Sequence, residues 1–199
     1  MPQPARPVLC LASSSPRRRE LLAQIGVPHT IAAAGIDETP LPRESASEYV
    51  ARLARAKAAA VRGRGERLPV LAADTAVVLD GRLYGKPENR EDSIEMLGRL
   101  SGRAHTVLTA VALAAAPDIA CRVSVSTVSF RQIGREEMSA YWDSGEPRDK
   151  AGGYAIQGYG AIFVASLEGS YSGVMGLPLF ETAQLLRAAA IPLWIGERP

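Results

Sequence analysis

Two charged residues stand at positions where a buried charge is costly. Asp74 interrupts the apolar run 69–79, and Lys57 lies on the apolar stripe of a segment with helical periodicity. A buried carboxylate in the middle of a strand must meet a cation, a metal ion or a hydrogen-bond network. An ion pair with an arginine would satisfy Asp74 for purely structural reasons, and Lys57 could extend its ammonium group to solvent. Because exposed positions for charge are plentiful nearby, we interpret both as site residues.

Lysine is rare in this chain. Of the 23 basic residues, 20 are arginine and only Lys57, Lys86 and Lys150 are lysine. A GC-rich genome that favours arginine codons accounts for this bias on the surface. Lysine provides a compact point charge that arginine does not replace, so the three retained lysines are candidates for a phosphate site. Lys86 follows a short strand, and Lys150 lies in a glycine-rich segment, where site residues are common.

The segment 7–26 is typical of a strand, a polar loop and a helix start. Ser13 and Ser15 lie in the loop, and Ser15 with the proline after it suits the N-cap and first helical position. Free backbone N–H groups and the helix dipole attract an anion there. Arg17 and Arg18 are unfavourable in a first helical turn unless a bound anion offsets their charge. A solvated basic turn and a phosphate cradle both remain open explanations.

Three further polar residues complete the set. Glu38 lies in the loop 35–42, Thr75 follows Asp74, and Gln157 lies in the glycine-rich segment 145–164. Several cations with two carboxylates form a phosphate site with room for Mg²⁺, which proteins bind through few carboxylates plus substrate phosphates. The residues therefore indicate an enzyme acting on a nucleotide or polyphosphate.

Composition excludes several other classes of protein. The chain has 199 residues, a net charge of +2, 47% hydrophobic residues and 22% charged residues, which is typical of a soluble globular protein. Near-neutral charge argues against a nucleic-acid polymer as partner. No apolar run approaches the roughly 18 residues of a membrane span, and the apolar stretch near the start is too short for a signal peptide. We therefore expect no membrane association and a cytoplasmic location.

Motifs of other enzyme classes are missing. The sequence contains no P-loop, no GxSxG, no HExxH and no CxxC pair. Gly158 and Gly160 form a GxG, but Phe163 stands where a dinucleotide fingerprint needs its third glycine. Cys10 and Cys121 are interpreted as small buried hydrophobes rather than as a disulfide.

Helical and strand patterns alternate as far as residue 100 and are then interrupted by a hairpin. Strands are expected at 7–12, 29–34, 69–79, 82–85, 103–114, 120–130 and 191–195, and helices at 16–25, 45–62, 91–100, 136–142 and 177–190. Ser45 and Glu48 form a capping box at the second helix. The order predicts an α/β fold with a mixed twisted sheet and flanking helices, with two lobes around a cleft in a single domain, 1–199.

The segment LASSSPRRRELL (11–22) resembles the opening signature of the Maf family of nucleoside triphosphate pyrophosphatases. Further blocks follow in the same order: SEYVARLARAKA, LAADTAVVLDG, GKPENREDSIEMLGRLSGRAHTVLTAVAL, GEPRDKAGGYAIQGYGAIFV and GSYSGVMGLPLFET. This resemblance covers nearly the whole chain. It implies an ITPase-like mixed α/β fold with a cleft, and hydrolysis of a nucleoside triphosphate to the monophosphate and pyrophosphate with a divalent cation, Mg²⁺ or Mn²⁺.

The resemblance also assigns roles. Asp74 matches the catalytic base and, with Glu38, a metal ligand. The remaining matches are phosphate-binding cations and phosphate-loop serines, namely Arg18, Lys57, Lys86, Ser13 and Ser15. Lys57 and Lys86 are taken with Asp74 as catalytic residues, and Lys150 as a substrate contact.

The DKAGGYAIQG block resembles the family branch selective for dTTP and UTP, in which Arg17, Thr75 and Gln157 match positions tied to specificity. A glutamine amide donates and accepts, which fits the O4 and N3–H edge of thymine or uracil. Two alternatives stay open: a 7-methyl-GTP pyrophosphatase, and a non-enzymatic nucleotide-binding regulator of septum formation. The oligomeric state is open as well, with a homodimer as one option. Two departures from the family pattern are small, the GIDE loop around Asp37 and Ser14 in place of a common glycine.

Overall fold

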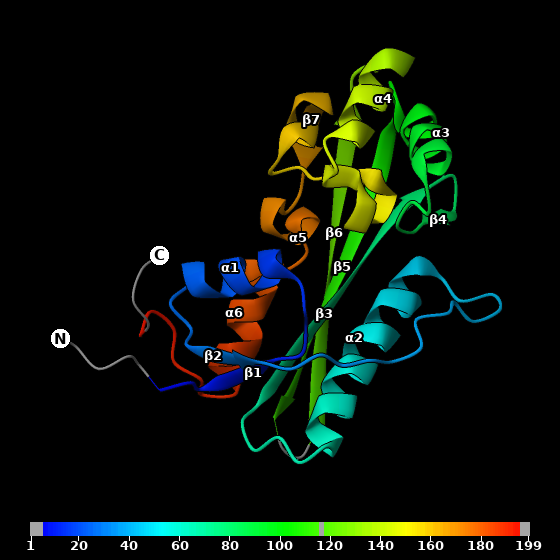
Figure 1. The fold of residues 1–199 in the computed structure, drawn as a ribbon. Helices are drawn as coiled ribbons and strands as arrows, with labels where there is room; N and C mark the ends of the chain where they lie inside the picture. Colours follow the sequence, from blue (N-terminus) through cyan, green and yellow to red (C-terminus); the bar gives the residue numbers. More distant parts are fainter. Residues whose placement is uncertain (1–5, 116–117, 196–199) are drawn as a thin grey trace. The chain divides into compact units, whose positions relative to one another are not determined.

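The computed structural model describes residues 6–115 and 118–195 and contains a seven-stranded mixed sheet with helices (Figure 1). The strand order is β2-β1-β3-β5-β6-β7, with β4 paired to β3. This confirms the predicted mixed α/β class. The chain divides into two compact units: unit 1 comprises Met1–Asp74, Thr109–Ser124 and Gly176–Pro199, and unit 2 comprises Thr75–Leu108 and Val125–Met175. The expected cleft and the single domain 1–199 stay predictions.

Unit 1 combines parallel strand pairs with helices. Its complete elements are β1 (Leu9–Leu11), α1 (Pro16–Gln24), β2 (His29–Ile31), α2 (Ala46–Gly63) and α6 (Leu179–Ala188). Strand β1 pairs in parallel with β2 and with the start of β3 (Val70–Leu79). Helix α2 begins at the predicted capping box, in which the side chains of Ser45 and Glu48 each accept the other's backbone N–H. The apolar stripe of α2 is buried as predicted, and Lys57 is buried with it.

Unit 2 contains antiparallel pairs and an aromatic core. Its complete elements are β4 (Arg82–Tyr84), α3 (Arg90–Leu100), α4 (Arg135–Asp143), β7 (Val164–Glu168) and α5 (Tyr171–Met175). Asp80 and Gly81 form the tight turn between the strands predicted at 69–79 and 82–85, since both residues have positive φ and β4 returns antiparallel along β3. Strand β7 pairs antiparallel with β6. The glycine-rich segment forms three short 3₁₀ helices before β7.

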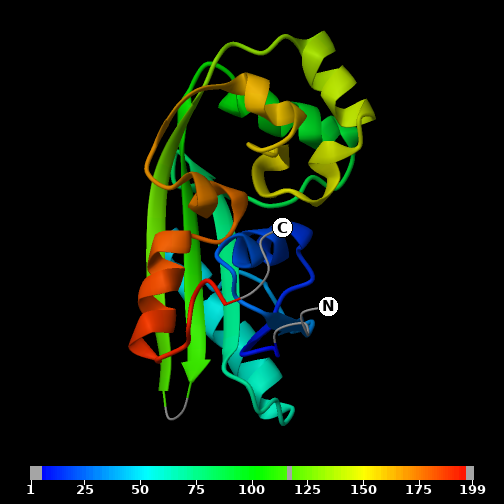
Figure 2. The same ribbon diagram turned by 90° about the vertical axis from the view of Figure 1, so that its left-hand side faces the viewer.

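The two longest strands belong partly to each unit. They are β5 (Ala104–Ala115) and β6 (Asp118–Phe130), which are neighbours in the sheet and are drawn as long arrows in Figure 2. The connection between the strands predicted at 103–114 and 120–130 includes Pro117, which lies outside the described residues. No helix of the described part of the chain has the length and apolar character that crossing a membrane requires.

Two sequence-based predictions of secondary structure are wrong. No helix is predicted within 169–176, but these residues include the short helix α5. No strand forms at 191–195; instead, the N–H groups of Trp194 and Ile195 donate to the carbonyls of Ile25 and Gly26 at 3.0 and 2.9 Å. Pro192 has no N–H to donate to a neighbouring strand, and Trp194 has a φ of 61°, which is not a strand conformation. The segment therefore contacts the end of α1 through these two hydrogen bonds instead of joining the sheet.

Candidate functional site

Lys57 joins two acidic side chains in unit 1. Its Nζ lies 2.6 Å from Asp74 Oδ1 and 2.8 Å from Glu38 Oε1. Lys57 faces inward because it shares the buried stripe of α2, and Asp74 lies in the middle of β3. Lys57 is 8% exposed and Asp74 is 6% exposed, whereas more than half of the Glu38 side chain is exposed. A buried Asp74 is expected to meet a cation, a metal ion or a hydrogen-bond network, and the structure shows a cation, which is a lysine.

The surroundings of Asp74 adjust its basicity. Burial raises the pKa of the Asp74 carboxyl above its ordinary value, and the charges of Lys57 and Arg18 oppose this shift without cancelling it. A carboxylate with a raised pKa accepts a proton more readily than an exposed aspartate does.

The loop before α1 folds around the hydroxyl of Ser13. Ser13 Oγ accepts the Ser15 N–H at 3.1 Å and an Nη1 hydrogen of Arg18 at 3.4 Å. Arg18 Nε also donates to the carbonyl of Gly176 at 2.8 Å. Burial lowers the pKa of the Arg18 guanidinium, while the charge of Asp74 raises it. Ser13 and Arg18 are therefore fixed side by side at the start of α1.

One detail of this helix start differs from the sequence prediction. Ser15 occupies the N-cap position with extended backbone angles, but its side chain makes no capping hydrogen bond. The Ser15 backbone N–H donates to Ser13 Oγ, which closes a short turn just before the helix. Arg17 lies in the first turn as predicted and is half-buried.

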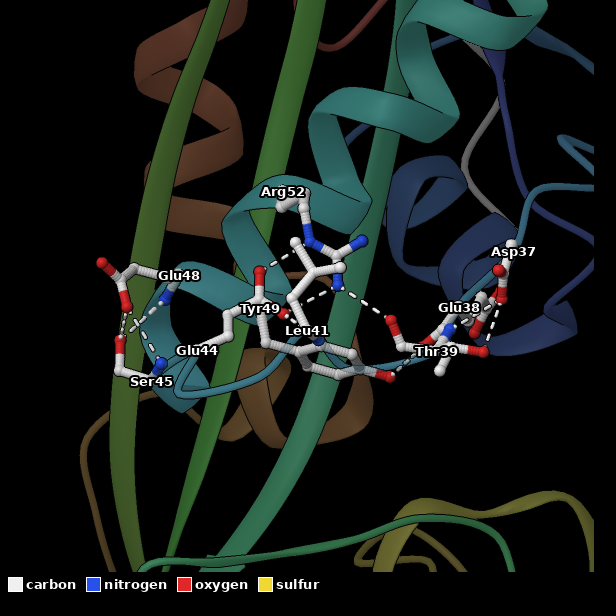
Figure 3. Close-up of polar contacts among 9 residues, drawn as sticks. All are labelled: Asp37, Glu38, Thr39, Leu41, Glu44, Ser45, Glu48, Tyr49 and Arg52. Carbon is white, nitrogen blue, oxygen red and sulfur yellow. Dashed lines mark hydrogen bonds and ion pairs between the residues drawn. The ribbon is translucent and has the colours of Figure 1, made fainter.

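Side chains of α2 hold the loop that carries Glu38 (Figure 3). We call residues 37–44 the Glu38 strap. The Tyr49 hydroxyl donates to the Glu38 carbonyl at 3.0 Å, and Arg52 Nη2 donates to the Thr39 carbonyl at 3.1 Å. Arg52 also binds both carboxylate oxygens of Glu44, at 2.6 and 2.7 Å. Helix α2 thus carries both Lys57 and the anchors of its partner Glu38.

The sequence reasoning missed Tyr49 and Arg52. Their spacing of three residues places them on one face of a helix, which was a detectable signal. Their partners are backbone carbonyls more than ten residues away, however, and backbone atoms leave no trace in the sequence.

Unit 2 carries the remaining predicted site residues. The Gly152 N–H donates to the carbonyl of Gly85 at 2.9 Å, which ties the segment of Lys150 to the strand end of Lys86. Lys86 is exposed, and the half-buried Lys150 ammonium contacts the Asp149 carboxylate. Gln157 is exposed and Thr75 is half-buried. Thr75 directly follows Asp74 in β3, where successive side chains point to opposite faces.

The two acidic residues suit a divalent cation that arrives with its substrate. Within residues 6–115 and 118–195, no group of three or more His, Cys, Asp and Glu side chains could hold a metal ion. The Lys57 contacts engage one oxygen each of Glu38 and Asp74, and every carboxylate has a second oxygen. Two carboxylates are enough for Mg²⁺ when substrate phosphates and water complete its shell. The donor set therefore fits a substrate-borne cation better than a permanently bound one.

The fold and this cluster define a mixed α/β protein with a partly buried site of acidic and basic side chains. The model of the Maf-like protein family matches residues 8–189, so the chain belongs to that family. It is 55% identical to the dTTP/UTP pyrophosphatase of Methylococcus capsulatus, over 90% of this chain and 89% of that protein. It is 56% identical to the dTTP/UTP pyrophosphatase of Alkalilimnicola ehrlichii, over 91% of this chain and 92% of that protein.

Among solved structures, the chain is similar to the Ham1 protein of Staphylococcus aureus. The identity is 16%, the match covers 78% of this chain and 79% of the other, and the TM-score is 0.41. The ITPase-like part of the fold prediction does not follow from a likeness at this level and stays a prediction.

Proposed function

We propose that this protein hydrolyses dTTP and UTP to the monophosphate and pyrophosphate. The observation that carries the proposal is the buried contact between Asp74 and Lys57, in which a carboxylate of raised pKa lies beside a fixed cation. Support comes from relatives that share 50–56% of their residues with this chain and are named dTTP/UTP pyrophosphatases.

In the proposed reaction, Asp74 takes a proton from a water molecule while the oxygen of that water attacks the α-phosphorus. A new P–O bond forms, the bond between the α-phosphorus and its bridging oxygen breaks, and pyrophosphate leaves with the bonding electrons. Lys57 orients Asp74, and Arg18 supplies positive charge beside it. Lys86 would neutralise charge on the leaving pyrophosphate. The proton then passes from Asp74 to solvent.

A divalent cation, Mg²⁺ or Mn²⁺, is part of this proposal. Glu38 and Asp74 would hold it, and when bound it neutralises phosphate charge. The Tyr49 and Arg52 contacts support this role, since they fix the backbone from which Glu38 projects.

Base selection is proposed to depend on Gln157. Its side-chain amide has both a donor and an acceptor, which complement O4 and N3–H of thymine and uracil. The residue is exposed, so the amide is available to a ligand. Arg17, Thr75 and Lys150 are proposed as further substrate contacts.

A substrate panel tests the proposal. The protein is incubated with dTTP, UTP, dCTP, GTP or 7-methyl-GTP, with Mg²⁺, Mn²⁺ or EDTA, and pyrophosphate and monophosphate are quantified. We expect release from dTTP and UTP that needs the metal and that falls at least about a hundredfold in the Asp74→Asn variant. Strong turnover of 7-methyl-GTP with none of dTTP or UTP would replace the proposed substrate. Nucleotide binding without any turnover would favour a regulator instead of an enzyme.

A further inference from the structure

Gln157 projects from a loop in unit 2 whose residues are buried before it and again at Gly160, whereas Tyr159 between them is 69% exposed. Tyr154, Ala155 and Ile156 are between 5% and 6% exposed, and Gly160 is buried as well. Gln157 itself is exposed. We call residues 155–160 the Gln157 loop. The loop therefore displays the side chains of Gln157 and Tyr159 from a segment that is buried at both ends, and a recognition contact needs such a supported backbone.

Two side chains outside the loop hold its backbone. The Glu146 carboxylate accepts the N–H groups of Tyr159 and Gly160, both at 3.0 Å. The Tyr141 hydroxyl donates to Glu146 at 2.7 Å and accepts the Ala155 N–H at 3.1 Å. These four hydrogen bonds form one network that brackets Gln157 on both sides.

The network itself is rigidly supported. Tyr141 is 5% exposed, and its ring packs edge-on against Phe163 with 5.0 Å between the ring centroids. Burial alone would raise the pKa of Glu146, but hydrogen bonds from the loop and from Tyr141 hold that pKa below its ordinary value. Glu146 therefore stays ionised and remains an acceptor for all of its donors.

The close approach of these side chains explains the two glycines of the GYG segment. A Cβ atom at Gly158 would lie 2.0 Å from Glu146 Oε2, and one at Gly160 would lie 2.7 Å from the Tyr141 hydroxyl oxygen. Any larger residue would displace the side chains that hold the loop. The glycine pair that fails as a dinucleotide fingerprint therefore has a different purpose, which is to admit Tyr141 and Glu146 to the backbone.

We propose that Tyr141 and Glu146 are positioning residues for base recognition, acting through Gln157. The inference rests on the proposed function. Thymine and uracil present an acceptor at O4 and a donor at N3, whereas cytosine presents the opposite pattern. Discrimination between the two patterns depends on where the Gln157 amide lies relative to the base, because hydrogen bonds weaken steeply when they are misaligned. A fixed backbone beneath Gln157 limits the positions that the amide can take.

The test compares Tyr141→Phe with the matched control Tyr171→Phe, a partly exposed tyrosine of the same unit. The kcat/KM values for dTTP and dCTP are measured for each variant with pyrophosphate detection. Removing the Tyr141 hydroxyl frees one end of the loop. We expect the dTTP-to-dCTP selectivity ratio to fall about three- to tenfold, the size of one or two modest hydrogen bonds. Tyr171→Phe should keep the wild-type ratio.

A second variant and a second background make the test specific. Glu146→Gln keeps the size of the side chain but turns an amide towards backbone donors, so the ratio should fall about tenfold. In the Gln157→Ala background, Tyr141→Phe should cause no further fall, because both changes act through one contact.

Three outcomes would overturn the inference. One is an unchanged ratio in both variants while the wild type hydrolyses dTTP. Another is an equal loss of kcat/KM on dTTP and dCTP, which would show a merely structural role. A third is a wild type that hydrolyses no pyrimidine triphosphate, and only this one also overturns the proposed function.

Discussion

Lys57 Nζ and Asp74 Oδ1 are 2.6 Å apart, and both side chains are buried. Helix α2 and strand β3 each contribute one charge, separated by 17 residues in sequence. Removing one partner of a buried pair leaves the other charge uncompensated, which typically costs about 3–5 kcal/mol. The pair therefore couples the stability of unit 1 to the group proposed as the base.

Replacing Asp74 by asparagine should abolish most turnover while leaving the protein folded. Asparagine has nearly the same shape and keeps an oxygen that can accept from Lys57, but it cannot take the proton. We expect kcat to fall by about 10²- to 10⁴-fold. Pyrophosphate release measures the loss, and thermal unfolding verifies the fold. Activity within twofold of the wild type would remove Asp74 as the base.

Replacing Lys57 by methionine should shift the pH dependence of kcat/KM. Asp74 must be ionised to act as a base, so activity falls as the pH drops through its pKa. Lys57 opposes the burial that raises this pKa, and without Lys57 the pKa rises further. The acidic limb of the profile should therefore move to higher pH.

Arg55→Met is the matched control for this shift, because Arg55 is an exposed cation on the same helix. Its profile should coincide with that of the wild type. An acidic limb that stays in place in Lys57→Met would contradict the coupling of Lys57 to Asp74.

Loosening the Glu38 strap should weaken the response to metal. Tyr49→Phe removes the hydrogen bond to the Glu38 carbonyl, and Arg52→Lys removes the two-pronged contact with Glu44. We expect the Mg²⁺ or Mn²⁺ concentration for half-maximal activity to rise about three- to tenfold in each variant. Arg55→Lys should not change it. The effect should vanish in a Glu38→Gln background, and an equal effect there would assign these residues a general structural role.

His105 should make unfolding sensitive to mildly acidic pH. Burial lowers its pKa to about 4 from an ordinary 6.5, and its Nε2 lies 2.9 Å from the Tyr154 hydroxyl. Well above pH 6.5 the imidazole is neutral in both the folded and the unfolded chain, and its contribution to the free energy of unfolding is fully present. Between pH 6.5 and 4 only the unfolded chain gains the proton, so stability falls as the pH drops.

The expected loss between pH 7 and 5 is about 2 kcal/mol in the free energy of unfolding. Denaturant unfolding of the wild type and of His105→Gln at both pH values measures it. The variant should lose less stability over this interval, because glutamine does not titrate. Equal losses in the two proteins would show that other groups cause the pH dependence.

The sequence by itself determined the local features. The capping box of Ser45 and Glu48, the adjacent strands predicted at 69–79 and 82–85, and the inward-facing stripe of α2 all formed. Each depends on residues within a turn or two of one another, so spacing and residue type are sufficient to recognise it. The unusual positions of Asp74 and Lys57 were also visible, because a charge within an apolar pattern is conspicuous.

Only the tertiary structure decided which residues meet. It paired Asp74 with Lys57, anchored the Glu38 strap through Tyr49 and Arg52, and placed Glu146 against N–H groups 13 and 14 residues further along. The partners in these contacts are mostly backbone atoms, which are chemically alike at every residue. Their selection depends on how distant segments pack, and that packing is a property of the whole fold rather than of any local pattern.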